Sequence, residues 1–205
     1  MPHTAKPVRT EALRVLIADD EHLVAAGLAA TVRSLGHECV GVVASADDAC
    51  AAAIRLEADI VLMDIQMPGT DGLAAAAALW QRDRVPSVIV SAYAERDHIE
   101  RSQQHGVFGY LIKPTSAQQL DAAIAVAFAR AAEVLERTER VDHLESTLSN
   151  RRTIERAKWN LVEAEKMTEA EAHARIQHLA RESRRRAVDV AAEILGDAPA
   201  PADAG

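Results

Sequence analysis

Apolar residues in the first half of the chain fall into short runs separated by longer amphipathic segments. Five of these runs are apolar at consecutive positions rather than at every second one, which is typical of parallel strands whose two faces are both covered by helices. The alternation predicts an α/β fold: a flavodoxin-like, doubly wound, five-stranded parallel sheet. The predicted strands are 14–18, 39–43, 60–63, 87–90 and 108–112, and the predicted helices are 21–34, 46–56, 72–81 and 95–105.

After Pro114 the pattern changes to that of one long helix. Its apolar or small residues recur at alternating spacings of four and three, the repeat of a coiled-coil seam, which Thr138 and Glu145 interrupt. We expect the helix to cover the sheet up to about residue 130, and the acidic part, 131–150, to project as a coiled coil that joins two copies of the chain. The seam consists of Leu120, Ile124, Ala127, Ala131, Val134, Val141 and Leu148.

No strand pattern follows residue 150, and three short amphipathic helices fit 151–196. Thr168 and Glu171 have the spacing of a capping box at the start of the second helix. A core this small is marginal, so we expect it to lean on the preceding helix or on a second subunit. The expected core positions are Ile154, Ala157, Leu161 and Ala164 in the first helix, Ala172, Ile176 and Leu179 in the second, and Val190, Ala191 and Ile194 in the third.

Composition narrows the class of protein. The 205 residues are 49% apolar and 26% charged, with 9 Gly and 7 Pro, as in globular proteins; we expect disorder only at the ends, 1–12 and 197–205. Cys39 and Cys50 are too few for a disulfide framework or a four-ligand zinc site, which fits a reducing compartment. No apolar stretch is long enough to span a bilayer. We therefore expect a soluble, cytoplasmic protein without membrane partners.

The net charge of −8 argues against a general polyanion-binding protein, but the charge is unevenly distributed. Residues 1–130 carry 11 basic and 16 acidic side chains, and residues 131–150 carry 2 and 5. Residues 151–205 carry 10 of each. We therefore expect any contact with nucleic acid to lie in the last segment.

Four predicted strands end in side chains that carry chemistry. The carboxyl ends of parallel strands meet at one edge of a sheet, and carboxylates that meet there repel one another unless a cation lies among them. Oxygen ligands of this kind indicate Mg²⁺. Each residue alone has a simpler explanation, as a helix cap or a solvated loop charge, but four strand ends together favour a site. The residues are Asp19, Asp20 and Glu21 after the first strand, Asp64 after the third, Ser91 at the end of the fourth, and Lys113 and Pro114 after the fifth.

Residues 13–130 resemble the receiver domain of two-component response regulators. The resemblance rests on the segments 15–21 (VLIADDE), 63–72 (MDIQMPGTDG), 91–92 (SA) and 109–114 (GYLIKP). It implies that a sensor histidine kinase transfers a phosphoryl group to an aspartate, and that Mg²⁺ is bound beside it. The implied phosphoacceptor is Asp64, and the implied magnesium ligands are Asp19, Asp20, Asp64 and the backbone carbonyl of Gln66.

The same resemblance implies a switch. Ser91 moves to the phosphate, Tyr110 rotates inward, Lys113 pairs with the phosphoryl oxygens, and Pro114 follows in a cis peptide bond. For Tyr110 a plain core position is the alternative. An enzyme is not expected beyond self-phosphotransfer and slow autodephosphorylation, because Gln66 stands where a phosphatase with an aspartate nucleophile needs a second acid/base aspartate.

The strongest basic cluster follows the second C-terminal helix. A solvated turn that favours the helix dipole is the simple alternative to a nucleic-acid contact. DNA reading is disfavoured, because the third helix offers only Asp189 and Glu193 where a recognition helix carries Arg, Asn or Gln. The cluster contains Arg181, Arg184, Arg185 and Arg186.

Residues 145–196 look like an ANTAR domain, on the segments 151–158 (RRTIERAK), 167–172 (MTEAEA) and 188–191 (VDVA), together with Leu161. The resemblance implies binding of paired RNA stem-loops and prevention of premature transcription termination. It carries over Ala157, Lys158, Ala172 and Ala191 as functional positions. Two residues depart from the family: Trp159 replaces the usual glycine and His173 the usual aromatic residue.

Trp159 is expected to point away from the helix's core face, between two arginines. There it could stack on an unpaired base, or pack against the long helix or a partner subunit. The residues expected to contact RNA are Arg152, Arg156, Lys158, Trp159, Arg181, Arg184, Arg185 and Arg186.

These features predict a receiver over 13–130, a coiled-coil linker over 131–150 and an RNA-binding domain over 151–196. The predicted function is a phosphorylation-dependent RNA-binding antiterminator, in which phosphorylation favours a homodimer and so presents two RNA-binding domains. The alternative is a signalling adaptor whose C-terminal helices bind a protein partner.

Overall fold

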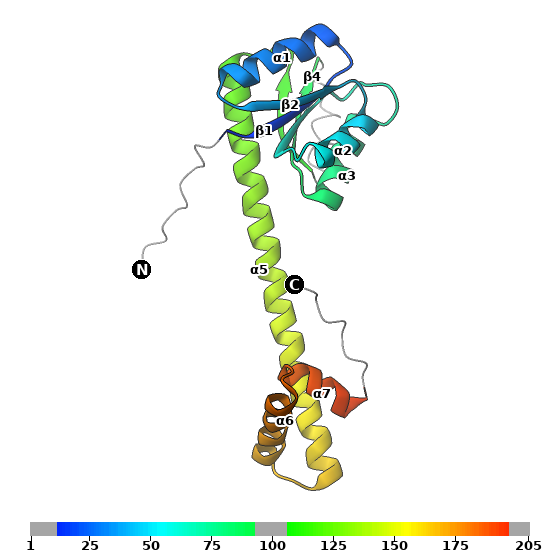
Figure 1. Ribbon diagram of the computed structural model, residues 1–205, viewed down its shortest axis with the longest axis vertical. Coiled ribbons are helices and arrows are strands. Elements are labelled where there is room, and N and C mark those ends of the chain that lie inside the picture. The colour runs from blue at the N-terminus through cyan, green and yellow to red at the C-terminus, as the bar shows by residue number, and fades with distance from the viewer. Residues whose placement is uncertain (1–11, 93–105, 197–205) are drawn as a thin grey trace, which may run out of the picture. The chain divides into compact units, whose positions relative to one another are not determined.

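A five-stranded parallel sheet organises the first of two compact units into which the chain divides after Leu135. The structure, a computed structural model, describes residues 12–92 and 106–196. The strand order β2-β1-β3-β4-β5 is that of a doubly wound sheet, as predicted. Figure 1 labels strands β1, β2 and β4 of this sheet. The strands are β1 (Arg14–Ala18), β2 (Glu38–Val43), β3 (Ile60–Met63), β4 (Ser87–Ser91) and β5 (Val107–Ile112), each within one residue of its predicted bounds.

Helices cover both faces of this sheet, which explains the consecutive apolar positions. In β1, Val15 and Ile17 belong to one buried cluster and Leu16 to the other. The cluster of Val15 and Ile17 contains residues of α1 (His22–Ser34) and of α5, and the cluster of Leu16 contains residues of α2 and α3. The remaining elements of this unit are α2 (Ala46–Arg55), α3 (Gly72–Asp83) and the first part of α5 (Ala117–Glu165).

The predicted helix over 95–105 lies outside the described residues. So do the ends predicted to be disordered, Ala12 excepted. Within the described ranges, no helix has the length and apolarity that crossing a membrane requires.

Helix α5 corrects one prediction. It runs without interruption from Ala117 to Glu165, so the first of the three predicted short C-terminal helices is the end of α5 and no break occurs near residue 150. The segment contains neither glycine nor proline, and polar side chains alone do not end a helix.

The exposure of the α5 seam changes along the helix. Leu120, Ile124, Ala127 and Ala131 are buried, as predicted for the part that covers the sheet. Val134, Val141 and Leu148 are 39%, 52% and 55% exposed. The second part of the seam therefore presents apolar side chains at its surface.

The second unit contains the end of α5, α6 (Glu169–Ser183) and α7 (Ala187–Leu195). The predicted capping box is present: the Thr168 hydroxyl accepts from the Glu171 N–H, and the Glu171 carboxylate accepts from the Thr168 N–H. Ala164 was expected in the core but is exposed, because it lies in the last turn of α5, one residue before the helix ends. The buried core is Ala157, Leu161, Ala172, Ile176 and Ala191.

Candidate functional site

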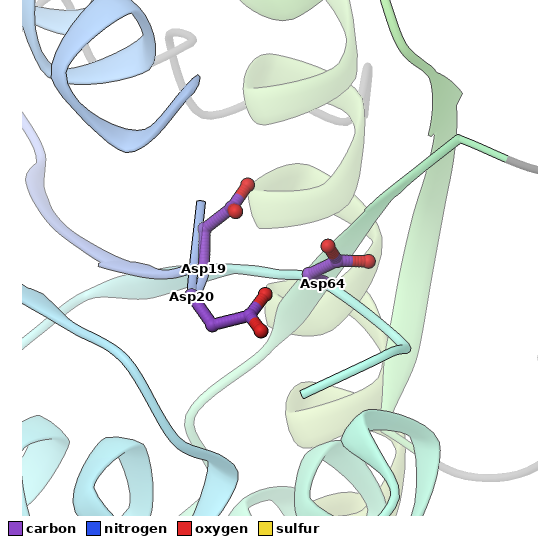
Figure 2. Close-up of side chains that lie close together, drawn as sticks. All are labelled: Asp19, Asp20 and Asp64. Carbon is purple, nitrogen blue, oxygen red and sulfur yellow. The ribbon is translucent and has the colours of Figure 1, made fainter. Parts of the chain in front are cut away.

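Three carboxylates meet at the carboxyl edge of the sheet. Ala18 of β1 lies beside Met63 of β3 in the parallel register, so the residues that follow, Asp19 and Asp64, come to lie next to each other. Together with Asp20 they offer carboxylate oxygens that all lie within 4.8 Å of one another (Figure 2). The convergence predicted from the strand ends is therefore found in the structure.

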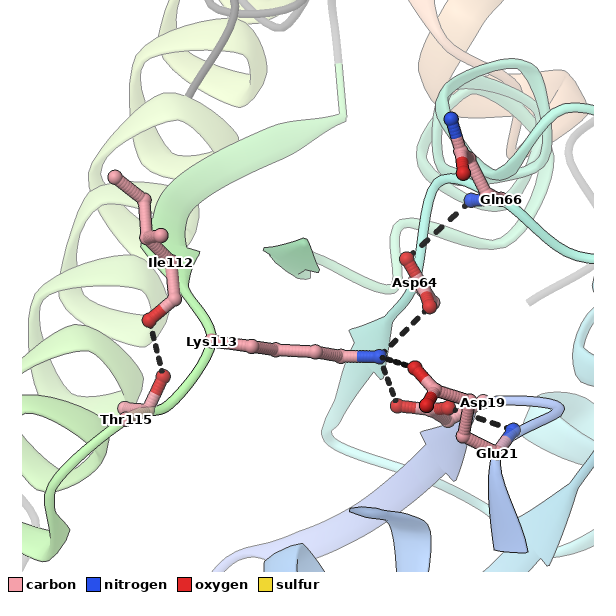
Figure 3. A network of polar contacts seen from close by, with 7 residues as sticks. All are labelled: Asp19, Glu21, Asp64, Gln66, Ile112, Lys113 and Thr115. Carbon is pink, nitrogen blue, oxygen red and sulfur yellow. Dashed lines mark hydrogen bonds and ion pairs between the residues drawn. The ribbon is translucent and has the colours of Figure 1, made fainter. Parts of the chain in front are cut away.

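Lys113 reaches this cluster from the end of β5 (Figure 3). Its ammonium nitrogen lies 2.8 Å from Oδ2 of Asp64, 2.8 Å from Oδ2 of Asp19 and 3.3 Å from Oε1 of Glu21. The Lys113 N–H donates to the carbonyl of Ser91 at 2.8 Å, which fixes the end of β5 beside β4. The Lys113–Pro114 peptide bond is cis, as the sequence resemblance implies.

Burial and pairing shift the pKa values of two of these groups. Asp19 is 1% exposed, and loss of solvent raises the pKa of its carboxyl, although Lys113 and the N–H of Glu21 oppose the shift. Burial by itself lowers the pKa of Lys113, but hydrogen bonds to Asp19 and Asp64 outweigh it and raise that pKa. The lysine is therefore held as a cation between two carboxylates.

The cluster carries more negative than positive charge. Oδ2 of the buried Asp19 pairs with Lys113 and accepts no other hydrogen bond from the described residues. A pocket of about 270 Å³ opens beside the carboxylate cluster, lined by Asp20, Glu21, Asp64, Gln66, Ser91 and Ala92. A donor set of carboxylate and carbonyl oxygens beside open space fits a hydrated Mg²⁺ ion.

A glycine shapes the turn that carries Asp64. Gly72 begins α3, whose N-cap is Asp71, and a Cβ atom at position 72 would lie 2.0 Å from the backbone oxygen of Asp64. The first turn of α3 can approach the backbone of Asp64 this closely only because residue 72 has no side chain. Gly72 belongs to the motif of the receiver resemblance, but its packing role was not predicted.

The two predicted switch residues lie in different surroundings. Ser91 is buried at the end of β4 and lines the pocket, as its predicted role requires. Tyr110 of β5 is half-buried and packs against the core cluster on the α2 and α3 face. The plain core position considered for Tyr110 therefore describes its present contacts.

Lys158 of the second unit lies in surroundings that its predicted RNA contact did not anticipate. It was expected to contact RNA, but its side chain is 9% exposed. The ammonium nitrogen lies 2.9 Å from Oε2 of Glu155 on the preceding turn of α5 and 2.7 Å from Oε1 of Glu169 at the start of α6. Two carboxylates thus occupy the charge that a phosphate would have to reach.

The other predicted RNA contacts are exposed. Trp159 is 58% exposed, as expected for a residue opposite the core face. Carboxylates of α7 already hold two of the clustered arginines: Arg185 lies 2.6 Å from Glu193, and Arg186 lies 2.9 Å from Asp189. The remaining exposed residues of the predicted set are Arg152, Arg156, Arg181 and Arg184.

Comparison with family models supports both family resemblances found in the sequence. Residues 15–125 match the model of the response regulator receiver domain, and residues 142–195 match that of the ANTAR domain.

Individual proteins match either most of this chain or about half of it. The transcriptional regulatory protein PdtaR of Mycobacterium tuberculosis is 37% identical over 186 residues, which cover 89% of this chain and 91% of that protein. The positive alginate biosynthesis regulatory protein of Pseudomonas aeruginosa is 40% identical over 114 residues, which cover 55% of this chain and 46% of that protein. Among solved structures, the signal receiver domain of a modulated diguanylate cyclase from Desulfovibrio desulfuricans G20 is 32% identical. Its TM-score is 0.56, and the match covers 60% of this chain and 98% of that one.

Proposed function

The chain belongs to the two-component response regulators that combine a receiver domain with an ANTAR domain, and from this we propose that phosphorylation of Asp64 controls RNA binding and transcription antitermination. One observation supports the phosphoryl-acceptor half most directly. Asp64 lines an open pocket, and a lysine and two further aspartates lie close to its carboxylate.

In the proposed reaction, a carboxylate oxygen of Asp64 attacks the phosphorus of a phosphohistidine on the sensor kinase. The new P–O bond forms as the P–N bond breaks, and the bonding electron pair leaves with the histidine nitrogen. Mg²⁺, held by Asp19, Asp20, Asp64 and the carbonyl of Gln66, would neutralise charge on the transferred group. Lys113 is already 2.8 Å from Asp64 and would pair with a phosphoryl oxygen.

Phosphorylation adds negative charge and acceptor oxygens at Asp64. Lys113 would exchange its contact with Asp19 for one with the phosphoryl group, and Ser91 would donate its hydroxyl to another phosphoryl oxygen. Inward rotation of Tyr110 would then alter the surface formed by the end of β4 and by β5. This is how we propose that the charge at one edge of the sheet reaches the receiver's outer surface.

The output half of the proposal rests on the ANTAR family and on the α5 seam. We propose that residues 13–130 act as the receiver, 131–150 as a coiled-coil linker and 151–196 as the RNA-binding domain. Val134, Val141 and Leu148 are exposed at the spacing of a coiled-coil seam, which supports a parallel pairing of two chains. Two linked domains would bind tandem RNA stem-loops with higher avidity than one.

Labelling with a small phosphodonor tests the first half. Acetyl phosphate and Mg²⁺ should add one phosphoryl group to the protein, detectable by mass. Asp64→Asn should abolish the addition, and Asp121→Asn, an exposed carboxylate on α5, should leave it unchanged. A phosphoryl adduct that persists in Asp64→Asn would refute the assignment of the acceptor.

A protein-binding adaptor is the second candidate. The ion pairs of Arg185 with Glu193 and of Arg186 with Asp189 favour it, because they lower the positive charge available to RNA. Replacing Arg181, Arg184, Arg185 and Arg186 by alanine separates the two functions. If the protein binds RNA, its affinity for RNA should fall and depend less on salt. If it is an adaptor, its binding to a protein partner should stay unchanged.

A further inference from the structure

Helix α6 has two exposed faces that differ in charge. Ala172 and Ile176 are buried in the core of the second unit. One exposed face carries two acids, and its bases are paired: His178 lies 3.6 Å from Glu182, and Arg175 pairs with Glu165 of α5. The other exposed face, which we call the polar face, carries His173, Gln177 and Arg181 at successive turns, followed by Arg184 where the helix ends.

The side chains of the polar face are joined in a row. The Nε2 atoms of Gln177 and His173 lie 2.9 Å apart, and Nη2 of Arg181 donates to Oε1 of Gln177 at 3.5 Å. Among the described residues, no carboxylate forms an ion pair with any of these three side chains. A glutamine amide and an arginine guanidinium have more hydrogen-bonding positions than this row uses, so the row is oriented and still able to bind.

One carboxylate lies on the polar face before His173, and it is paired with a lysine. Glu169 lies four residues before His173, at the start of α6. Lys158 lies 2.7 Å from it and also contacts Glu155. The ammonium group lowers the pKa of Glu169 and offsets part of its charge at the end of the polar face. Lys158 therefore reduces the repulsion between Glu169 and an anion bound at the polar face, although Lys158 itself belongs to α5.

We propose that the polar face of α6 is the RNA-contacting surface, and that Lys158 supports it only by pairing with Glu169. The inference rests on the proposed RNA-binding function and specifies its surface. Exposed donors without neighbouring carboxylates suit a phosphate backbone, and the glutamine amide, which both donates and accepts, suits a ribose hydroxyl or a base edge. Gln177 and Arg181 touch the RNA, whereas Lys158 is a positioning residue.

The first experiment uses the full-length protein treated with acetyl phosphate and Mg²⁺. A tandem-hairpin RNA library with randomised loops is enriched on it, and the best RNA becomes the probe. Gln177→Ala and Arg181→Ala should each weaken binding by about tenfold, and Arg181→Ala should also reduce the slope of log affinity against log salt by about 0.7–0.9. His178→Ala, on the other face of the same helix, should bind within about twofold of the parent.

The second experiment concerns Lys158. Lys158→Met should weaken binding without reducing the number of released counterions, so the salt slope stays unchanged. The double variant Lys158→Met/Glu169→Gln should recover most of the affinity, because it removes Glu169, the carboxylate that Lys158→Met leaves unpaired at the end of the polar face. A direct phosphate contact by Lys158 predicts the opposite: a smaller slope and no recovery.

The outcomes separate the inference from the function it rests on. Failure to enrich any RNA would overturn the proposed RNA-binding function and the inference with it. An enriched RNA that Gln177→Ala and Arg181→Ala bind as tightly as the parent would overturn the inference alone. An equal loss in His178→Ala would do the same, since the effect would then not belong to the polar face.

Discussion

Each unit of the molecule holds a largely buried lysine that contacts two or more carboxylates, and the two clusters differ in what surrounds them. The side chains of Lys113 and Lys158 are 11% and 9% exposed. Lys113 lies 2.8 Å from both Asp19 and Asp64, and Lys158 lies 2.9 and 2.7 Å from its two glutamates. Local geometry alone would therefore assign both lysines the same role.

The difference lies in what each cluster leaves unsatisfied. Beside Lys113 there are further acids, an oxygen of Asp19 that accepts no hydrogen bond from any other described residue, and an open pocket. Lys158 uses its ammonium group on Glu155 and Glu169 and joins two consecutive helices. A buried lysine between carboxylates is therefore no sign of a ligand site by itself. Excess charge next to accessible space is the more informative feature.

The largest effect is expected from a substitution that prevents α3 from lying close to Asp64. Gly72→Ala should destabilise the first unit by about 3 kcal/mol and abolish labelling by acetyl phosphate, because the new methyl group overlaps a backbone oxygen. Urea unfolding and mass spectrometry measure the two effects. The control is Gly27→Ala on α1, where a Cβ meets no atom within 4 Å. Equal stability of the two variants would show that the turn is not constrained as described.

Making the same lysine-to-methionine substitution in each of the two clusters tests the comparison directly. Lys113→Met should slow labelling of Asp64 by about a hundredfold, because it removes a cation from the transferred phosphoryl oxygens. Lys158→Met should leave the labelling rate unchanged. Phosphoprotein formation over time, followed by mass, gives both rates. Similar slowing in both variants would mean that the two lysines do not differ as we argue.

A smaller effect is expected at the interrupted seam of α5. Glu145→Leu should tighten self-association by about tenfold or more, because each chain would bury an extra leucine in place of a charge. Glu139→Leu, an exposed position off the seam, is the control. Sedimentation equilibrium of the full chain measures the dissociation constant. If both variants associate equally, the gain is general hydrophobicity and not a specific seam.

The smallest expected effect is an acid limb, by which we mean a loss of stability of the second unit as the pH falls. Lys158 lowers the pKa of Glu169 from 4.5, so the folded form binds a proton less readily than the unfolded form. The resulting stability is present above pH 4.5 and is lost as the pH falls through the lowered value. Lys158→Met should therefore lose less stability below pH 4.5 than the parent.

This limb can be measured in the intact chain. The two tryptophans lie in different units, so Trp80→Phe leaves Trp159 as a reporter of the second unit. Urea midpoints of its fluorescence at several pH values, with and without Lys158→Met, give the comparison. Identical acid dependence would show that the Lys158–Glu169 pair contributes nothing to it.

The sheet and its functional edge could be predicted from the sequence for a definite physical reason. Strands covered on both faces need consecutive apolar residues, so runs such as 60–63 mark them closely. Parallel strands then bring their carboxyl ends together, whatever the spacing along the chain. Asp19, Asp64 and Lys113 were therefore placed correctly although they are far apart in sequence.

The second unit was harder to predict because its key contacts cross a turn. Nothing local to Lys158 shows that Glu169, on the next helix, returns to pair with it. Continuation of α5 through residue 150 depends on backbone hydrogen bonds, which a change in polarity does not reveal. The contact between His173 and Gln177 was not predicted, although their spacing of four residues was a signal available in the sequence.

The contact of Gly72 with the backbone of Asp64 also bears on how this chain tolerates variation. In a library that replaces every residue in turn, position 72 should score nearly as intolerant as position 64, although it contributes no side chain and no chemistry. Essential positions in such a scan would thus include one defined by the space that a missing methyl group leaves.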